Sequence, residues 1–288
     1  MPATLKKLKR LIKENNIDIV HSHLNPAGVY SHLVCPVPHV HTLHTTYSMD
    51  RETQPFKLFL EKYLYFKKKS CNIILLSDFI KEDFLRSVPF KGQAFVLNNF
   101  VPDVFFNTSA KVYDQECTSL KLVAVGRLSE VKNFKYLLEV FTYLKDEEIY
   151  LDIYGGGDVE KYQEYIKSSG IKVNMKGYNN NMQSLLNEYD VFIMPSKFEG
   201  VPLSLFEAMA SGIPLMLSAI APLKNIVKEH AIYFDLDNAA TTAAAILSVL
   251  KKETDINSMA KKAQVYAHSV ARKDIYIQKL LDIYNKLE

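Results

Sequence analysis

The sequence predicts an α/β protein of two domains, each built on a parallel sheet. Short apolar, β-branched runs alternate with amphipathic segments of helical length from one end of the chain to the other. The runs IDIV, NIILL, LVAV and VFIM are apolar at consecutive positions, as strands that are covered on both faces must be. A chain of 288 residues is long enough for two domains of roughly 100–200 residues each.

This alternation of strand-like and helix-like segments indicates repeated α/β units. Helical segments between the strands include 133–144 and 159–169, and two further helices are predicted at 255–269 and 273–287. The predicted strands are 17–23, 39–44, 72–77, 94–98, 120–126, 150–154, 172–177, 191–196, 214–218 and 231–234.

A polar stretch without periodicity divides the chain. We predict a linker at 109–119, between an N-terminal domain over 1–108 and a second domain over 120–270, with a final helix over 271–288. The N-terminal domain opens on a helix and supplies four strands. If the strand at 17–23 is buried in a doubly wound sheet, it needs a neighbour on each side. We therefore expect this domain to be incomplete, lacking its first segment, with an apolar sheet edge that a partner would cover.

Composition argues against several functional classes. A formal net charge of +3, with no long basic tract interleaved with aromatics, argues against nucleic-acid binding. The three cysteines, Cys35, Cys71 and Cys117, show neither metal-ligand spacing nor a disulfide framework, so we expect a reducing compartment. No apolar stretch approaches the roughly 20 residues that span a bilayer. Residues 1–13 read as a basic helix rather than a secretory signal, and we expect a cytoplasmic protein.

The strongest functional signal is the segment FEGVPLSLFEAMASGIP at 198–214. It follows the predicted strand DVFIMPS, so Glu199 falls in a loop at the carboxyl end of a parallel strand, where ligands of open α/β sheets bind. Pro202 suits the first turn of a helix, which places Glu207 within that helix. Carboxylates can hold the hydroxyls of a ribose or hexose, and a helix N-terminus favours an anion. Taken alone, the two glutamates could equally be solvated charges.

A second signal is the segment LVAVGRLSEVKNF at 122–134, which combines a strand, a glycine and a short loop. Arg127 follows the glycine, and Lys132 lies near the predicted start of the next helix. Arginine offers a bidentate fork, lysine a point charge and the helix N-terminus a dipole, so the arrangement suits a diphosphate. The alternative is a pair of ordinary surface cations.

The order of these segments resembles a known family. GRLSEVKN is followed by IYGGG, MKGY and DVFIMPSKFEGVPLSLFEAMASGIP, and preceded by IDIVHSHL, HVHTLHTTYS, IILLSDFIKEDF and VLNNFVPDVF. This succession is similar to the retaining glycosyltransferases of family 4, which have the GT-B fold of two Rossmann-like domains facing across a cleft. The resemblance covers nearly the whole chain, and its combination of GR…K with E-x7-E is specific.

The resemblance implies roles for individual residues. Arg127 and Lys132 match residues that hold the donor diphosphate. Glu207 matches the glutamate that binds the ribose hydroxyls, and Glu199 matches the one near the donor sugar. The other matched residues are Gly200, Val201, Pro202 and Leu203, whose backbone would contact sugar hydroxyls and phosphate, Tyr178 at the nucleotide base, and His44, which would face the transferred sugar from the N-terminal domain.

The family further implies a nucleotide diphosphate sugar as donor, no other cofactor and no metal. The acceptor would be a sugar or a lipid-linked molecule, in polysaccharide or glycolipid biosynthesis, and the final helix would cross back to the N-terminal domain. Arg127, Lys132 and a helix dipole meet the demand for charge stabilisation on the departing diphosphate. Glu199 would orient the sugar or stabilise positive charge at the anomeric carbon, and we do not assign it as a nucleophile.

The sequence departs from the family in two places. The glycine-rich loop that follows the first N-terminal strand is absent, and Asn98–Asn99–Phe100 stands where Asn-Gly is usual. A second hypothesis follows, a nucleotide-sugar-binding remnant or subunit that needs a missing N-terminal segment or a partner. A nucleotide-sugar epimerase or phosphorylase of related architecture is a third, against which the two motifs together favour the transferase.

Histidines and acidic pairs give weaker signals. His39 and His41 share one face of a strand, but no Cys or acidic ligand accompanies them in sequence, so we predict no metal site. The segment DLD at 235–237 resembles a metal motif of a different glycosyltransferase fold. It lies between a short strand and an Ala-rich helix, which favours Asp237 or Asn238 as an N-cap.

Lysines and arginines gather on the helix at 1–13 beside a leucine stripe, and a second basic run lies at 67–69. One interpretation is a peripheral contact with anionic lipid, which would suit a lipid-linked acceptor. The interpretation that we favour is a helix packed on the sheet with solvated lysines.

Overall fold

The computed structural model of the chain describes residues 2–44, 63, 65, 71–107, 112–113 and 118–287. The basic run at 67–69 and Cys117 lie outside these residues, as does most of the linker predicted at 109–119. Residues 1–99 and 274–288 form one compact unit, and residues 100–273 form another. Each unit is described below by itself.

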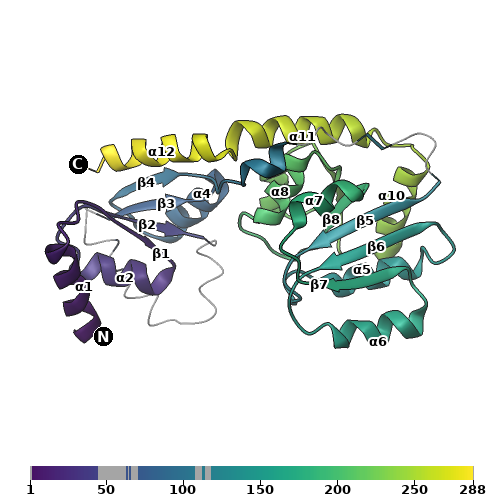
Figure 1. Cartoon of the computed structure of the whole chain (residues 1–288), viewed down its shortest axis with the longest axis horizontal. Helices are drawn as coiled ribbons and strands as arrows, with labels where there is room; N and C mark the ends of the chain where they lie inside the picture. Colours follow the sequence, from purple (N-terminus) through teal and green to yellow (C-terminus); the bar gives the residue numbers. More distant parts are fainter. Residues whose placement is uncertain are drawn as a thin grey trace. The chain divides into compact units, whose positions relative to one another are not determined.

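The first unit is built on a parallel sheet of order β1-β2-β3-β4. Its two inner strands, β2 and β3, are buried at every position. The elements are α1 (Pro2–Glu14), β1 (Val20–His23), α2 (Asn25–Val34), β2 (His39–Leu43), β3 (Asn72–Leu75), α4 (Asp78–Ser87), β4 (Gln93–Val96) and α12 (Lys273–Asn285) (Figure 1).

The strand predicted at 17–23 is corrected by the structure, because β1 begins only at Val20. The chain leaves α1 through Asn16, which has a positive φ of 49°, and Ile17 is 39% exposed. β1 lies at the edge of the described sheet, and Val20 is its one apolar residue. The edge strand therefore does not present the apolar row that the run IDIV predicted.

The helix α12 packs on the sheet of this first unit (Figure 1). Ile283 joins Val40, Ile74 and Leu97 in one buried cluster, and further side chains of α12 pack against it. The hydroxyl of Tyr284 lies 2.7 Å from Nδ1 of His21 on β1. The C-terminal helix thus supplies part of the core of the N-terminal sheet.

At the other end of the sequence, α1 packs against α2. Ile12 is buried and Leu11 is 42% exposed. The solvated lysines expected on this helix are present: the exposed cations of α1 are Lys6, Lys7, Lys9, Arg10 and Lys13.

The second unit is built on a six-stranded parallel sheet of order β10-β9-β8-β5-β6-β7. The chain begins in the middle at β5, continues outward through β6 and β7, and then returns to β8 on the other side of β5. In doubly wound sheets this reversal of direction leaves a crevice at the carboxyl ends of the central strands, where ligands bind.

Buried side chains from the strands and from α5 and α10 form the core of the second unit. Apart from β1, every predicted strand boundary in the chain lies within two residues of the observed one. The elements of this unit are η2 (Asp103–Phe106), β5 (Leu120–Val125), α5 (Phe134–Thr142), β6 (Ile149–Tyr154), α6 (Glu160–Ser169), β7 (Val173–Gly177), α7 (Met182–Leu185), η3 (Leu186–Glu188), β8 (Val191–Met194), α8 (Leu203–Ser211), β9 (Leu215–Ser218), α9 (Ala221–Val227), β10 (Ile232–Phe234), α10 (Ala239–Leu250) and α11 (Ile256–Val270).

The helix after the DLD segment begins with a side-chain cap. Oδ1 of Asn238 accepts from the backbone N–H groups of Ala240 and Thr241 at 3.0 and 3.2 Å. This confirms the N-cap interpretation for α10 at Asn238, one of the two residues proposed.

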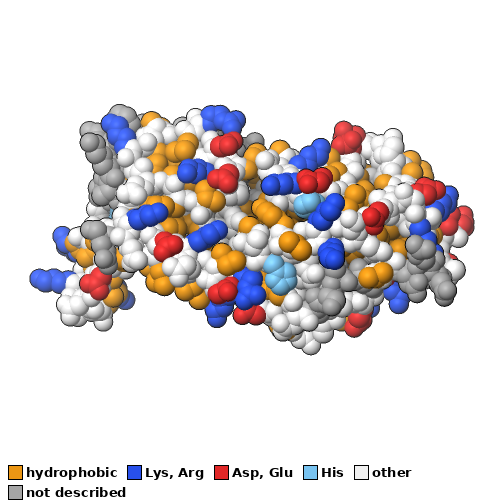
Figure 2. Space-filling model, turned by 90° about the horizontal axis from the view of Figure 1, so that it is seen from above, with side chains coloured by type: hydrophobic (Ala, Val, Ile, Leu, Met, Phe, Trp, Pro, Cys, Tyr) orange, Lys and Arg blue, Asp and Glu red, His pale blue; other side chains and the backbone are white. Residues whose placement is uncertain are grey.

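Two surface properties bear on partners. On the face shown in Figure 2, basic and acidic side chains are interspersed, and the described residues visible there form no patch of one sign. Among the described residues, none of the helices has the length and apolar character needed to cross a membrane.

Candidate functional site

The second unit carries a cavity of about 770 Å³ at the carboxyl ends of β5, β6 and β7. This size falls within the range of about 300–1,000 Å³ typical of small-molecule sites. The lining residues are Pro102, Val104, Phe105, Val125, Gly126, Arg127, Tyr154, Gly155, Gly156, Gly157, Tyr178, Asn179, Asn180, Met182, Gln183 and Glu207.

Glycines allow the loops after β5 and β6 to approach each other closely beside this cavity. A Cβ atom at Gly155 would overlap the carbonyl oxygen of Gly126, and one at Gly157 would lie 2.7 Å from Cβ of Leu128. Gly157 also has a φ of 138°, which side chains rarely allow. The backbone N–H of Leu128 donates to the carbonyl of Gly156 at 2.9 Å. The two loops are thereby held together beside Arg127.

Three of the predicted site residues line the cavity together: Arg127 after β5, Tyr178 after β7 and Glu207 on α8. The side chains of Arg127 and Tyr178 are exposed, Tyr178 by 77%. Glu207 is half-buried, and this burial raises the pKa of its carboxyl group. The cavity therefore combines a guanidinium, an accessible aromatic ring and a carboxyl group on separate elements.

Lys132 and Glu199 lie next to this cavity and form an ion pair. Nζ of Lys132 donates to Oε1 of Glu199 at 2.6 Å, and Oγ of Ser196 donates to the same oxygen at 2.6 Å. Glu199 is 8% exposed, so its charge is largely removed from water. The stem of Lys132 lies along Gly126, because a Cβ there would be 3.3 Å from Cδ and Cε of Lys132. Lys132 is thus held at the edge of the cavity by a buried carboxylate.

Side-chain hydrogen bonds to backbone carbonyls fix the segment that carries the pair. Nδ2 of Asn133, a residue with a φ of 55° just before α5, donates to the carbonyl of Pro195 at 3.2 Å. Oγ of Ser218 on β9 donates to the carbonyl of Ser196 at 2.6 Å. The first bond ties the loop after β5 to the end of β8, across the point where the strand order reverses, and the second ties the end of β9 to the same place.

The loop over Gly200–Leu203 leads directly into α8. Pro202 is the N-cap rather than part of the first turn, a shift of one residue from the prediction, and Glu207 lies within the helix as predicted. The Pro202 N-cap makes no side-chain hydrogen bond to the first turn of α8. The side chain of Val201 is buried. The backbone N–H groups at this end are therefore the groups suited to an anion.

His44 belongs to the first unit, where it follows β2 and meets other histidines. Its Nε2 lies 3.1 Å from Nδ1 of His23 at the end of β1, and the His21 and His23 rings stack at 4.3 Å. Burial, and then the neighbouring His23, lower the pKa of His44. Burial, with smaller contributions from His23 and His44, lowers the pKa of His21 to about 4. These neutral rings form one hydrogen-bonded and stacked group.

The sequence analysis missed several of these partners. Ser196 has a weak signal, since it stands at the end of a predicted strand three residues before Glu199. His23 belongs to the same HSH run as His21, but nothing in the sequence pairs it with His44. The polar side chains of Asn179, Asn180 and Gln183 line the cavity beside Tyr178 without any motif.

Family models match both parts of the chain. The model described as "Glycosyl transferases group 1" matches residues 107–266, more than half of the 288 residues. The chain belongs to this glycosyltransferase family. A second model, described as "Glycosyltransferase Family 4", matches residues 1–104.

Curated relatives of this glycosyltransferase are moderately similar in sequence. The UDP-Gal:alpha-D-GlcNAc-diphosphoundecaprenol alpha-1,3-galactosyltransferase of Escherichia coli is 25% identical over 98% of this chain and 78% of its own length. The O-antigen biosynthesis glycosyltransferase WbnH of Escherichia coli is 26% identical over 80% of this chain and 66% of its own length.

Solved structures show the fold of this glycosyltransferase. Anabaena Alr3699/HepE in complex with UDP aligns with a TM-score of 0.83 and 15% identity, covering 98% of this chain and 82% of that one. Sucrose-phosphate synthase from Thermosynechococcus elongatus aligns with a TM-score of 0.82 and 18% identity, covering 99% of this chain and 77% of that one. The fold is GT-B, as the resemblance implied.

Proposed function

We propose that this glycosyltransferase moves a hexose from a nucleotide diphosphate sugar to a sugar or lipid-linked acceptor, with retention of anomeric configuration and without a metal. One observation carries the proposal. The cavity at the carboxyl ends of β5, β6 and β7 gathers Arg127, Tyr178 and Glu207, and Lys132 lies at its edge. This set of side chains suits a dianionic diphosphate, a flat base and a pair of ribose hydroxyls.

Each part of the donor has a suitable group. The Arg127 guanidinium can take two phosphate oxygens at once, and Lys132 adds a point charge. The exposed ring of Tyr178 offers a stacking surface for the base. Glu207 can accept from the ribose hydroxyls, and the backbone N–H groups at the start of α8 suit phosphate or sugar oxygens.

The charge that develops during transfer supports the proposal of a reaction with retention and without a metal. As the bond from the anomeric carbon to the diphosphate breaks, negative charge grows on the leaving oxygen, beside Arg127 and Lys132. Fixed cations there replace the Mg²⁺ that other sites use for the same purpose. The leaving phosphate can take the proton of the attacking hydroxyl on the same face of the sugar. Glu199 and His44 would orient the transferred sugar, Glu199 through its buried carboxylate.

The names of relatives support the substrate class. The Escherichia coli relative uses UDP-Gal and a lipid-linked acceptor, and another relative is a poly(glycerol-phosphate) alpha-glucosyltransferase of Bacillus subtilis. Solved structures of Alr3699/HepE hold UDP-glucose or UDP. These names favour a uridine donor and a setting in polysaccharide or glycolipid assembly.

Calorimetric titration with a panel of nucleoside diphosphates tests the donor site. We expect one nucleotide to bind, and Arg127→Ala and Glu207→Ala each to weaken it about 10-fold or more. Lys135→Ala and Glu139→Ala, exposed positions on α5, are the matched controls and should bind as the parent does. Equal binding by all four variants would overturn the site assignment.

Transfer assays with the matching nucleotide sugars test the reaction. The anomeric configuration of the product, read by NMR coupling constants, is expected to be that of the donor. The rate should be the same with Mg²⁺ added or omitted. Nucleotide binding without transfer or donor hydrolysis would instead support the alternative, a binding subunit that needs a partner for catalysis.

A lipid-linked acceptor would bring the protein to a membrane surface, and the exposed cations of α1 would suit anionic lipid. Co-sedimentation with vesicles containing phosphatidylglycerol tests this contact. Charge reversal of Lys6, Lys9 and Lys13 should abolish it. Co-sedimentation that charge reversal leaves unchanged would exclude a contact between α1 and anionic lipid.

A further inference from the structure

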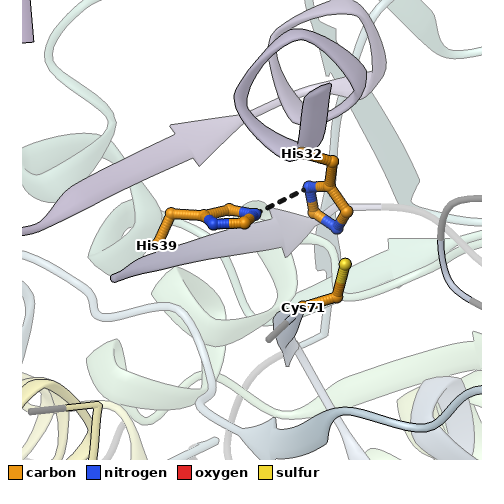
Figure 3. A group of neighbouring side chains, drawn as sticks. All are labelled: His32, His39 and Cys71. Carbon is orange, nitrogen blue, oxygen red and sulfur yellow. Dashed lines mark hydrogen bonds between the residues drawn. The ribbon is translucent and has the colours of Figure 1, made fainter. Parts of the chain in front are cut away.

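Three buried side chains meet at the amino ends of β2 and β3. His39 is the first residue of β2, and Cys71 directly precedes β3. The parallel register pairs Val40 with Asn72, so the residues one position earlier, His39 and Cys71, lie side by side. His32 reaches this place from the last turn of α2. Figure 3 shows the three side chains directed toward one another.

The cluster is enclosed and close-packed. His32 is 1% exposed, His39 4% and Cys71 0%. Nδ1 of His32 lies 3.0 Å from Nε2 of His39, and the nitrogen and sulfur atoms that the three residues offer all lie within 4.8 Å of one another. Around a tetrahedral Zn²⁺, two nitrogens lie about 3.3 Å apart and a nitrogen and a sulfur about 3.5 Å apart, from bond lengths of about 2.0 and 2.3 Å. Metal binding would bring the three ligand atoms to these separations.

We propose that His32, His39 and Cys71 bind a thiophilic divalent cation, Zn²⁺ in the first instance, as a structural site of the N-terminal unit. Two imidazoles and a thiolate are ligands that zinc prefers, whereas Mg²⁺ and Ca²⁺ prefer oxygen. The three residues leave a fourth position for a water molecule. On binding, the Cys71 thiol releases its proton to solvent. The proton in the His32–His39 hydrogen bond moves to a ring nitrogen that does not bind the metal.

Neighbouring groups hold the ligands in place. The amide of Asn72 donates to the backbone carbonyl of His39 at 3.2 Å, and the ring of Tyr65 lies 5.1 Å from that of His32, edge to face. Such surrounding contacts fix the orientation of metal ligands. The ion would link α2, β2 and β3, three elements that separate segments of the chain supply.

This site is distinct from the glycosyl-transfer chemistry. His44 follows the carboxyl end of β2, while His39 begins the strand. A strand of five residues spans roughly 15 Å at about 3.3 Å per residue. The ion would therefore stabilise the first unit and take no part in transfer. The sequence analysis predicted no metal because Cys71 is far from the histidines along the chain, and only the sheet register brings it to them.

The test uses the full chain, stripped with a chelator and reloaded with Co²⁺ or Zn²⁺. We expect about one metal ion per chain by elemental analysis. The Co²⁺ form should show the near-ultraviolet thiolate-to-cobalt charge-transfer band, which requires a cysteine ligand. Zn²⁺ should also raise the unfolding temperature of the parent chain, since it binds only the folded site.

Variants assign the ligands. The double variant Cys35→Ser/Cys117→Ser keeps Cys71 as its one cysteine and should retain the cobalt band in full. Cys71→Ser should lose the band, and His39→Gln should weaken metal binding at least about 10-fold, with circular dichroism checking that each remains folded. His230→Gln, in the other unit, is the histidine control.

Several results would overturn the proposal. These are substoichiometric metal in the reloaded parent, a cobalt band lost from the Cys35→Ser/Cys117→Ser variant, or an unchanged band in Cys71→Ser. In each case the three side chains would be a hydrogen-bonded part of the core. Because the double variant retains Cys71, the assignment does not depend on whether Cys71→Ser folds.

Discussion

Lys132 and Glu199 form a 2.6 Å ion pair whose carboxylate oxygen also accepts from Ser196. The resemblance gave these two residues separate tasks, at the diphosphate and at the donor sugar. The contact couples those tasks. A diphosphate that attracts the ammonium group of Lys132 must either share it with the carboxylate of Glu199 or break the ion pair. A buried pair of this kind is costly to break by removing one partner.

Substitution of Glu199 separates the two tasks. Glu199→Gln removes the anion that competes for Lys132, so we expect the Kd of the nucleoside diphosphate to stay the same or fall, while the rate of transfer falls at least about 100-fold. Lys132→Met should raise the Kd about 10- to 100-fold, through loss of a charge-assisted bond of about 1.5–3 kcal/mol. Calorimetry and transfer assays on the same preparations measure both quantities.

The exposed pair Lys135→Met and Glu139→Gln on α5 provides the control for charge alone, and neither should change Kd or rate. If Glu199→Gln weakened nucleotide binding as much as Lys132→Met does, the carboxylate would have to be part of the diphosphate site itself.

Neighbouring glycines in the loop after β6 should differ sharply in tolerance. Gly155→Ala places a Cβ against the carbonyl of Gly126, a backbone atom that cannot rotate away, and should reduce the free energy of unfolding by about 3 kcal/mol. Gly156→Ala meets no atom within 4 Å and should change stability by less than about 0.5 kcal/mol. Urea unfolding of both variants checks the pair, and equal losses would contradict the close approach of the two loops.

The histidines of β1 and β2 should make stability depend on pH. Burial lowers the pKa of His21 to about 4 and that of His41 to about 3, from 6.5 in the unfolded chain. Below about pH 6.5 the unfolded chain therefore binds more protons than the folded protein does. The stability that is present above that pH is lost progressively on acidification. The urea concentration at the midpoint of unfolding should therefore decrease as the pH is lowered from about 7.5 to about 5.

His21→Gln removes one of these groups and should flatten the pH dependence. A parent chain with the same midpoint throughout this interval would show that the rings are protonated in the folded state. That result would contradict the buried, neutral group described around His44.

Removing the cap of α10 should cost about 1 kcal/mol of unfolding free energy. In Asn238→Ala the backbone N–H groups of Ala240 and Thr241 lose their acceptor. Asn225→Ala, which removes a bond within α9 from Nδ2 to the carbonyl of Ala221, should have a smaller effect because no helix terminus depends on it. Equal midpoints for Asn238→Ala and the parent would dismiss the capping role.

Local patterns predicted the strands and the positions of several candidate-site residues for identifiable reasons. β5 and β8 are central strands, so the runs LVAV and VFIM had to be apolar at consecutive positions. The position of Glu207 followed from Pro202 and the helical spacing after it. The run IDIV led to a wrong start for β1, because apolar residues that precede an edge strand have the same pattern as the first residues of a buried strand.

Contacts between segments that are distant in the sequence could not be predicted. Lys132 meets Glu199 across 67 residues, through the pairing of β5 with β8. Cys71 meets His39 only because of the β2–β3 register. The contact of α1 with α2 was not predicted either, since an apolar stripe indicates that a helix is covered but does not identify the covering surface.

The packing of α12 on the first sheet sets an order of events during synthesis. Residues 1–99 emerge from the ribosome first, yet Ile283 and its neighbours complete their apolar core. Part of the core of the N-terminal unit therefore stays uncovered until the whole of the second unit has been translated. At roughly 5–20 residues per second this interval lasts on the order of ten seconds or more, a window in which chaperones can bind the nascent chain.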